Sequence, residues 1–299
     1  MLPIVYHPDY QAPLRPGHRF PMSKYGYLRQ ALESRGLLPL GKFFAPRAFT
    51  APQIELAHAR SYVDRVLTLT LSPAEVRQIG LPATERVVRR STLSVAGTTL
   101  AAWLALEHGI ACNAAGGSHH AGPDHGSGFC VFNDVAVAIR NLSAQGVRGP
   151  FLVIDADVHQ GDGTARIFAS DPDVVTFSIH AAKNFPQQKS ESTIDIPLQD
   201  GVGGQAYLDV FEHALMELLE RVHPRLAFYN AGVDVHAEDR LGRLALDDAD
   251  LRARDRMVLS ALRQRSIAVV GVLGGGYHPD PTRLAGLHAI MFEEAASFV

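Results

Sequence analysis

The chain has 299 residues, of which 46% are hydrophobic and 20% charged, a balance typical of a globular protein with a sizeable core. Its 28 basic and 31 acidic residues give a net charge of −3, which leaves no electrostatic signature of a nucleic-acid or membrane partner. The two cysteines form no disulfide framework, and the sequence shows neither a signal peptide nor an apolar run near the roughly 18 residues that span a bilayer, so we expect a cytoplasmic protein.

The first hundred residues predict mainly helices. Ser72 followed by Pro73 has the pattern of a helix N-cap and first position. We expect a strand at residues 2–6, a loop over 10–21, helices over 24–34 and 52–67, a helix opening at Ser72, and a buried helix over 84–108 closed by Gly109.

From residue 110 onward, apolar runs of strand length alternate with helical stretches. Such alternation is typical of a parallel sheet covered by helices on both faces. No repeat or flexible linker interrupts it, so we predict a single domain over residues 1–299. The expected strands are 110–114, 151–154, 174–179, 226–229 and 267–273, and the expected helices are 133–145, 164–169, 205–222, 247–264 and 281–298.

Four of these strands end in glycine, a reactive polar side chain, or both. In open parallel sheets ligands bind beyond the carboxyl ends of the strands, so the four ends are expected to meet around one pocket. The ordinary tendency of loops to collect polar residues explains one or two such ends, but explains four poorly. The four ends comprise residues 116–120, 155–159, 230–234 and 274–278.

The strand end at residues 155–159 carries the clearest metal-ligand pattern. On an extended backbone Asp155, Asp157 and His159 leave the same face. A strand running into a polar turn would explain one Asp-x-His, but the additional carboxylate favours a metal site. Asp157, His159 and Asp234 together offer three ligands for a divalent ion, and Zn²⁺, Fe²⁺ and Co²⁺ all suit this oxygen and nitrogen set.

The adjacent His119 and His120 suit a general acid and a general base better than a shared metal. Asp155 and Asp162 are available to fix their tautomers. Tyr277 follows three glycines and is placed to donate a hydrogen bond to a developing oxyanion, although a tyrosine packed over the loop would give the same pattern.

At these residues the chain resembles the zinc-dependent histone deacetylase family, which includes acetylpolyamine amidohydrolases and acetoin-utilisation proteins. The motifs occur in the family's order, cover nearly the whole chain and are most similar to the bacterial and class IV branch. They are Gly-Gly-Ser-His119-His120-Ala, Gly128-Phe129-Cys130-Val-Phe-Asn133-Asp134, Asp155-Ala-Asp157-Val-His159-Gln-Gly-Asp162-Gly, Asn-Ala-Gly-Val-Asp234 and Gly-Gly-Gly-Tyr277.

The resemblance implies an arginase-like three-layer α/β/α fold with a mainly parallel, eight-stranded sheet. It implies zinc on Asp157, His159 and Asp234, and structural potassium at two further places. One potassium site would map onto Asp155, Asp157, His159, Ser178 and Ile179, largely through carbonyl oxygens, and a second onto Phe168, Asp171 and Val174.

The same resemblance implies a hydrolase that removes acyl groups, acetyl or longer, from the ε-amine of lysine. His119 and His120 would be the acid–base pair, with His120 as the base, and Tyr277 would polarise the acyl carbonyl. Asp155 and Asp162 would support the two histidines, and the substrate would lie among Phe129, Phe185, Gly128 and Leu241.

Two departures from the family pattern bear on the substrate. Gly80 stands where class I members carry an aspartate that grips the substrate backbone. Ser118 stands where a bulky aromatic is often found, which predicts a roomier inner pocket. The alternatives are a deacylase of acetylpolyamines or other small acylamines, a dimanganese ureohydrolase, which would need more acidic ligands near Asp234, and a silent acyl-lysine binder; the oligomeric state stays open.

Overall fold

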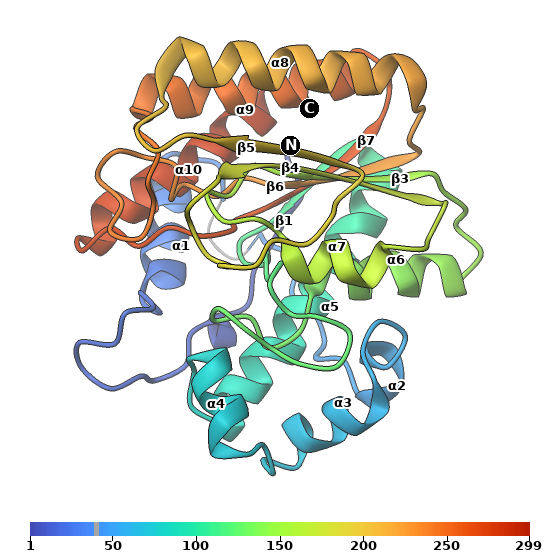
Figure 1. The fold of residues 1–299 in the computed structure, drawn as a ribbon, viewed down its shortest axis with the longest axis vertical. Helices are drawn as coiled ribbons and strands as arrows, with labels where there is room; N and C mark the ends of the chain where they lie inside the picture. Colours follow the sequence, from blue (N-terminus) through green and yellow to red (C-terminus); the bar gives the residue numbers. More distant parts are fainter. Residues whose placement is uncertain (39–41) are drawn as a thin grey trace.

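A computed structural model describes residues 1–38 and 42–299 and has a parallel β-sheet at its centre (Figure 1). Within these residues the sheet has seven strands in the order β1-β2-β7-β6-β3-β4-β5, and every neighbouring pair is parallel. The strands are β1 (Ile4–Val5), β2 (Ile110–Asn113), β3 (Phe151–Asp155), β4 (Val174–Ala181), β5 (Ile194–Leu198), β6 (Leu226–Asn230) and β7 (Ala268–Val272).

Helices cover both faces of the sheet. Helices α8, α9 and α10 lie on one face, with α1 packed against α10, whereas α5, α6 and α7 lie on the other face and α2 to α4 extend beyond α5 (Figure 1). A short 3-10 turn, η1 (Pro8–Tyr10), follows β1. The helices are α1 (Lys24–Ser34), α2 (Ala51–Ile54), α3 (Arg60–Leu67), α4 (Pro73–Ile79), α5 (Glu85–His108), α6 (Asp134–Ala144), α7 (Asp162–Phe168), α8 (Gly204–Arg221), α9 (Asp248–Arg263) and α10 (Pro281–Ala296).

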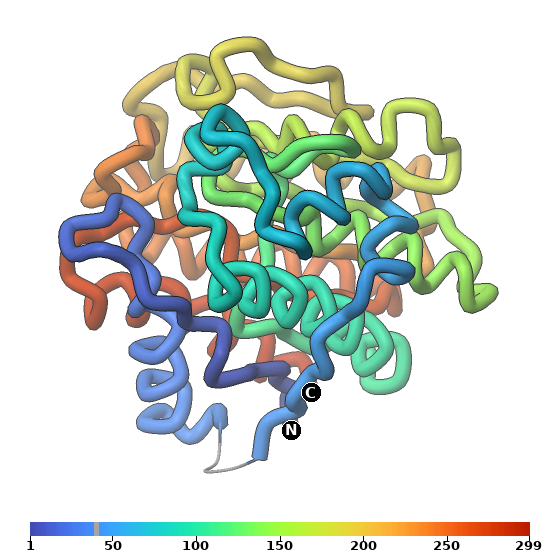
Figure 2. Tube along the Cα trace, turned by 90° about the horizontal axis from the view of Figure 1, so that it is seen from below, coloured from blue at the N-terminus to red at the C-terminus, as the bar shows by residue number. Residues whose placement is uncertain are grey.

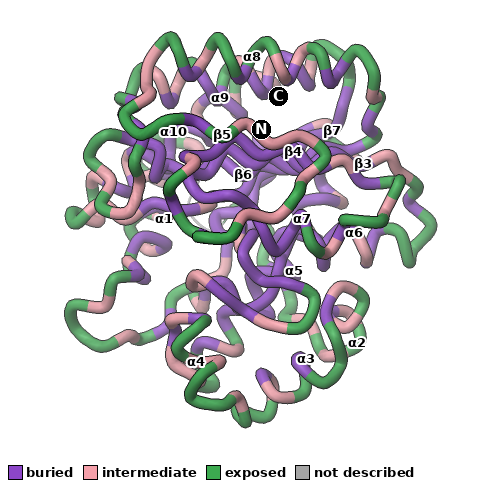
Figure 3. Tube along the Cα trace, viewed as in Figure 1, coloured by how far each residue is buried: buried purple, intermediate pink, exposed green. Residues whose placement is uncertain are grey.

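The central strand β3 is buried on both faces, as its continuous apolar run predicts. Phe151 and Val153 pack with the apolar side chains of α5 and α6. Leu152 and Ile154 alternate with them and join the core beneath α8, α9 and α10. Figure 3 shows the central strands buried and the outer turns of α8 exposed. The sheet is therefore a rigid support for whatever lies at its edges.

The long helix α5 follows the predicted span closely. The Thr84 side chain accepts a hydrogen bond from the Val87 N–H at the first turn. Gly109 closes the helix with a φ of 85°, a left-handed conformation that glycine adopts without strain. Both signals were present in the sequence.

The single helix predicted over residues 52–67 is wrong, because the structure has two helices, α2 and α3, at that place. His58 lies between them, buried, with Nδ1 2.8 Å from the Gly122 carbonyl oxygen and Nε2 accepting from the Asn133 N–H. The Ala59 N–H donates to the Pro123 carbonyl. These bonds to a distant segment replace the helical bonds and break the helix.

The eight-stranded sheet is also corrected, to seven strands in the part of the chain that the structure describes. Among the described residues, the segment at Phe44 makes an isolated parallel bridge with Val5 of β1, and Pro46 follows two residues later with no N–H to extend the pairing. Strand β5 was not predicted from the sequence. It is a partly exposed edge strand containing Asp195 and Pro197, so it lacks the apolar run that marked the other strands.

No helix in the described residues is both long and apolar enough to span a membrane. The two cysteines, Cys112 and Cys130, are free and buried. The ends of the chain lie close to each other, as the two perpendicular views in Figures 1 and 2 show.

Candidate functional site

The four polar strand ends come together at one edge of the sheet. Strands β2, β7, β6 and β3 are neighbours, and because all are parallel their carboxyl ends share that edge. The loops are packed tightly there, since a Cβ on Gly117, after β2, would overlap the backbone of Gly274, after β7. Glycine is therefore required for the loops to approach each other.

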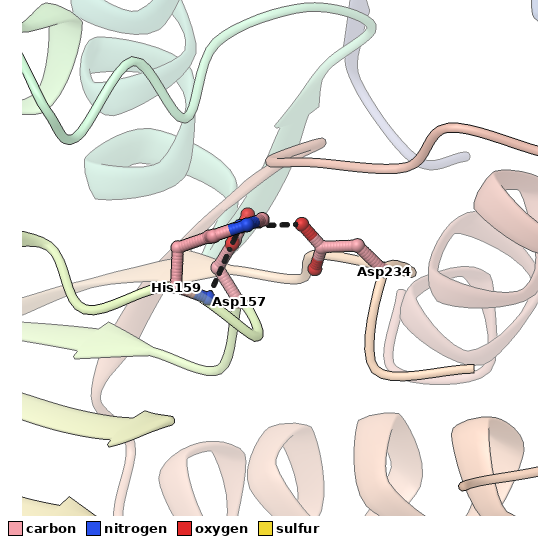
Figure 4. Close-up of side chains that lie close together, drawn as sticks. All are labelled: Asp157, His159 and Asp234. Atoms are coloured by element: carbon pink, nitrogen blue, oxygen red, sulfur yellow. Dashed lines mark hydrogen bonds and ion pairs between the residues drawn. The ribbon is translucent and has the colours of Figure 1, made fainter. Parts of the chain in front are cut away.

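Asp157, His159 and Asp234 form a buried cluster in which one ligand atom from each lies within 4.8 Å of the others. His159 Nδ1 lies 3.0 Å from Asp157 Oδ1 and 3.1 Å from Asp234 Oδ2 (Figure 4). The second oxygen of each carboxylate is held by the backbone, Asp157 Oδ2 by the Gly275 N–H at 2.6 Å and Asp234 Oδ1 by the Val158 N–H at 2.9 Å. Each acid thus presents one oxygen to the shared space.

The three groups of this cluster strongly perturb one another's protonation. Burial and the charge of Asp157 raise the pKa of Asp234 to about 7. Burial opposes protonation of His159, but the two carboxylates outweigh it and raise its pKa to about 10. A divalent cation would stabilise both carboxylates in their charged form, and two carboxylate oxygens with one imidazole nitrogen match a three-ligand catalytic zinc site. The residues present therefore fit such an ion.

The histidine pair is bonded to carboxylates in the order that the sequence suggested. His119 Nδ1 lies 2.7 Å from Asp155 Oδ2, and His120 Nδ1 lies 2.6 Å from Asp162 Oδ1. The second oxygen of Asp162 is contacted by Arg166, one turn along α7. Because these contacts use Nδ1, the second ring nitrogen of each histidine, Nε2, is left to exchange a proton with a substrate or water.

The two imidazoles differ in charge preference. Burial lowers the proton affinity of His119, but Asp155 and Asp157 outweigh it and raise its pKa to about 9. Burial, together with the neighbouring His119, lowers the pKa of His120 to about 4 despite Asp162. At neutral pH His119 is therefore a charged donor and His120 is a neutral acceptor.

Tyr277 lies beside this cluster, with its ring centroid 6.3 Å from that of His159 and 5.9 Å from that of Phe129. Burial and the nearby carboxylates Asp234 and Asp157 raise the pKa of its phenol well above the usual value, so the group keeps its proton. Its backbone N–H donates to Asp239 Oδ2 at 2.7 Å. The phenol is thus a protonated hydrogen-bond donor on an anchored segment of backbone.

A pocket of about 500 Å³ leads from the surface to these groups. His120, His159 and Tyr277 lie at its inner end, and the residues expected to contact substrate line it, namely Phe129, Phe185, Gly128 and Leu241. Phe185 is 45% exposed, and its ring packs edge-on against His120 at 4.8 Å.

The wall at Gly128 and Phe129 is closely fitted. Gly128 has a φ of 54°, and a Cβ there would lie 2.5 Å from Cδ2 of His120. Phe129 has a φ of 67°, a left-handed conformation that strains a non-glycine residue. Its backbone N–H is held by the Ile79 carbonyl at 2.7 Å, at the end of α4. This backbone conformation places the Phe129 ring in the pocket wall.

A second, internal cavity lies behind the cluster and is lined in part by Ser118, His119 and Tyr277. Its volume is about 20 Å³, which is room for about one water molecule. That Ser118 makes the inner pocket roomier than a bulky aromatic would stays a prediction.

The residues expected to bind potassium lie in two separate places. Asp155 and Ser178 are register partners in β3 and β4, with Ile179 following Ser178. Phe168, Asp171 and Val174 share the turn between α7 and β4, where the Asp171 N–H donates to the Phe168 carbonyl at 3.0 Å. Potassium at either place stays a prediction.

Three further residues support the site and were given no role from the sequence. Asp239 accepts hydrogen bonds from the backbone of Leu241, Gly242 and Tyr277. Asn230 donates to Asp155 Oδ1 at 2.9 Å, and Asn184 donates to the Leu241 carbonyl at 2.6 Å. Asn230 opens the Asn-Ala-Gly-Val-Asp motif, so its position at a strand end was a usable signal; nothing in the local pattern marks Asn184.

Comparisons with known proteins agree with this site. The histone deacetylase domain model matches residues 18–291. An uncharacterized protein of Picosynechococcus sp. is 45% identical over 293 residues, covering 98% of each chain, and a histone deacetylase-like amidohydrolase of Pseudomonas aeruginosa is 30% identical, covering 94% of this chain and 78% of the other. The crystal structure of an HDAC homolog from Aquifex aeolicus matches with a TM-score of 0.82 at 23% identity, covering 99% of this chain and 84% of that one, which confirms the arginase-like α/β fold.

Proposed function

The chain belongs to the histone deacetylase family and is an amidohydrolase of that type, and from this premise we propose that it removes acetyl groups from the ε-amine of lysine with a bound zinc ion. One observation carries the proposal. His159, which forms a buried cluster with Asp157 and Asp234, lines the same pocket as His120 and Tyr277.

Asp157, His159 and Asp234 would hold the ion. A zinc ion bound there acts as a Lewis acid toward an acyl oxygen and lowers the pKa of a bound water. Fe²⁺ or Co²⁺ would suit the same ligands, and ligand identity alone does not separate them.

The protein's own side chains supply the proton transfers. His120, neutral and fixed by Asp162, is the base that accepts a proton from the attacking water through Nε2. His119, charged and fixed by Asp155, stabilises negative charge in the site and is the acid of the pair. Tyr277 donates a hydrogen bond from its hydroxyl to the oxygen of the acyl group as negative charge develops there, and keeps its proton.

The shape of the pocket favours a slender substrate with a short acyl group. Phe129 and Phe185 flank the entrance to His120 and suit the four-carbon stem of lysine. The internal cavity of about 20 Å³ leaves little room beyond an acetyl methyl group. We therefore propose acetyl in preference to longer acyl groups, and potassium in a structural role at the two places named above.

The other functions considered from the sequence have weaker support. A dimanganese ureohydrolase needs acidic ligands for two ions, and the described residues hold one three-ligand group of this kind. A silent acyl-lysine binder would not need His119 and His120 to be bonded to separate carboxylates. Acetylpolyamines carry a similar amide on a chain of methylene groups, and the same experiment tests them.

The test is a matched panel assayed with zinc-loaded protein: one neutral peptide carrying acetyl-, butyryl- or octanoyl-lysine, together with N-acetylputrescine. We expect turnover to be highest on acetyl-lysine and to fall with acyl length, because the inner cavity is small. His159→Ala is the matched control and should lose both the metal and the activity. If protein with full metal content releases no carboxylic acid from any of the peptides, the proposal is wrong. If N-acetylputrescine is the preferred substrate, the substrate is a polyamine and not lysine.

A further inference from the structure

Arginines gather at the outer rim of the pocket. Arg15 and Arg19 come from the loop that precedes α1, and Arg77 comes from α4. All three are exposed. The described residues that line this pocket include no aspartate or glutamate, so the rim is uniformly cationic.

These charges are not neutralised by neighbours. Among residues 1–38 and 42–299, Arg15, Arg19 and Arg77 take part in no ion pair with an acidic side chain. The contrast within the same region is clear, because Arg65 pairs with Glu75 of α4 at 2.8 Å.

The acidic residues closest in sequence to the lining residue Leu241 already have hydrogen-bond or ion-pair partners. Asp239 accepts three backbone N–H groups, and Glu238 pairs with Arg283 at 2.9 Å. Lys183 and Arg240 are exposed and next in sequence to the lining residues Asn184 and Leu241.

A cationic rim selects substrates by charge before they reach the inner site. Guanidinium groups bind carboxylates with paired hydrogen bonds, and uncompensated charges of one sign steer the opposite charge toward them. A polycationic substrate such as a polyamine or a basic peptide would be repelled. Gly80, beside Arg77 in the same wall, adds no carboxylate to offset this field.

Resting on the proposed function, we infer that Arg15, Arg19 and Arg77 form a specificity-determining rim that recognises carboxylates flanking the acyl-lysine. The preferred substrate is then acyl-lysine in an acidic stretch of polypeptide. Three separate cations suit several carboxylates spaced along a chain better than a single anion on a small molecule.

The experiment compares three acetyl-lysine peptides that differ only in their flanks, which are aspartate-rich, neutral or lysine-rich. For zinc-loaded protein at low salt we expect kcat/KM on the acidic peptide to exceed that on the basic peptide about tenfold or more, as several weak exposed pairs combine. The ratio should shrink toward one near 0.5 M salt, roughly where the screening length falls below 5 Å. Free Nε-acetyl-lysine, with its single carboxylate, is the small-molecule arm.

The variants assign the effect to the rim. The triple variant Arg15→Gln, Arg19→Gln, Arg77→Gln should reduce the acidic-to-basic ratio at least fivefold, mainly through KM. Arg148→Gln is the matched control, because Arg148 is exposed and precedes β3 at the opposite edge of the sheet, and it should keep the ratio of the parent protein.

Several outcomes would overturn the inference. If kcat/KM is equal on all three peptides, or if the triple variant keeps the preference, the three arginines do not recognise the substrate. The proposed function would stand in either case. A higher kcat/KM on free Nε-acetyl-lysine than on the acidic peptide would replace the polypeptide with a small acid. Absence of turnover on every acetyl-lysine substrate would reject the proposed function, and this inference with it.

Discussion

The hydroxyl group of Tyr277 is the side-chain feature whose role can be isolated most cleanly. Tyr277→Phe removes the donor but keeps the ring that packs against Phe129 and Phe20. We expect kcat to fall roughly 10²–10³-fold, the usual loss for one oxyanion donor, with full metal content. Steady-state kinetics with elemental analysis measures both. Tyr27→Phe, on a 38% exposed side chain of α1, should change neither, and parent-like kcat in Tyr277→Phe would remove the phenol from the mechanism.

Gly275 shows how a backbone position controls the metal ligands. A Cβ there would overlap the Asp234 carboxylate and lie 2.8 Å from Asp157 Oδ2, and its N–H holds that same oxygen. Gly275→Ala should therefore displace both acids and lower bound zinc well below one equivalent, as elemental analysis would show. Gly286→Ala is the control, because its Cβ would lie no closer than 3.7 Å to another group. A normal zinc content in Gly275→Ala would mean that the two aspartates are not the ligands.

At the scale of secondary-structure elements, α9 fixes the loops that carry the metal ligands. Arg254 of α9 is fully buried, and it donates to the Gly232 carbonyl at 2.7 Å and the Ala156 carbonyl at 3.3 Å, just after β6 and β3. It also bonds Asp255, which accepts from the Tyr229 hydroxyl. One side chain thus ties a helix to two strand ends.

Arg254→Leu should lower the free energy of unfolding by roughly 3–5 kcal/mol, because it leaves Asp255 buried without its cation. Denaturant unfolding monitored by circular dichroism measures the loss. Arg256→Leu, two residues along α9, removes an exposed guanidinium and should have a much smaller effect. Equal losses in the two variants would show that the buried pair has no special part in stability.

The elements that the sequence predicted well were those with local signals. Helix α5 carried both its caps, and β3 carried a run of apolar residues ending on carboxylates. Strand β5 had neither signal, because an edge strand is only half covered and tolerates Asp195 and Pro197. The break at His58 depended on hydrogen bonds to Gly122 and Asn133, which no local pattern encodes.

For the whole molecule, the candidate site was predictable because parallel strands must deliver their ends to one edge. That rule predicts that Asp157, His159 and Asp234 lie together, and in the structure one ligand atom from each lies within 4.8 Å of the others. The rim was not predictable in this way. Arg15 and Arg77 reach the pocket from a loop and from α4, and no local sequence pattern indicates that these two segments lie at the pocket.

The order of strands in the sheet also determines how the protein could be divided. Segments near residues 119, 157, 234 and 277 meet only because β2, β7, β6 and β3 stand side by side. No continuous fragment shorter than that whole span contains the reactive groups, so proteolytic pieces or minimised versions would be inert. A ribosome must release nearly all of the chain before any of its chemistry exists.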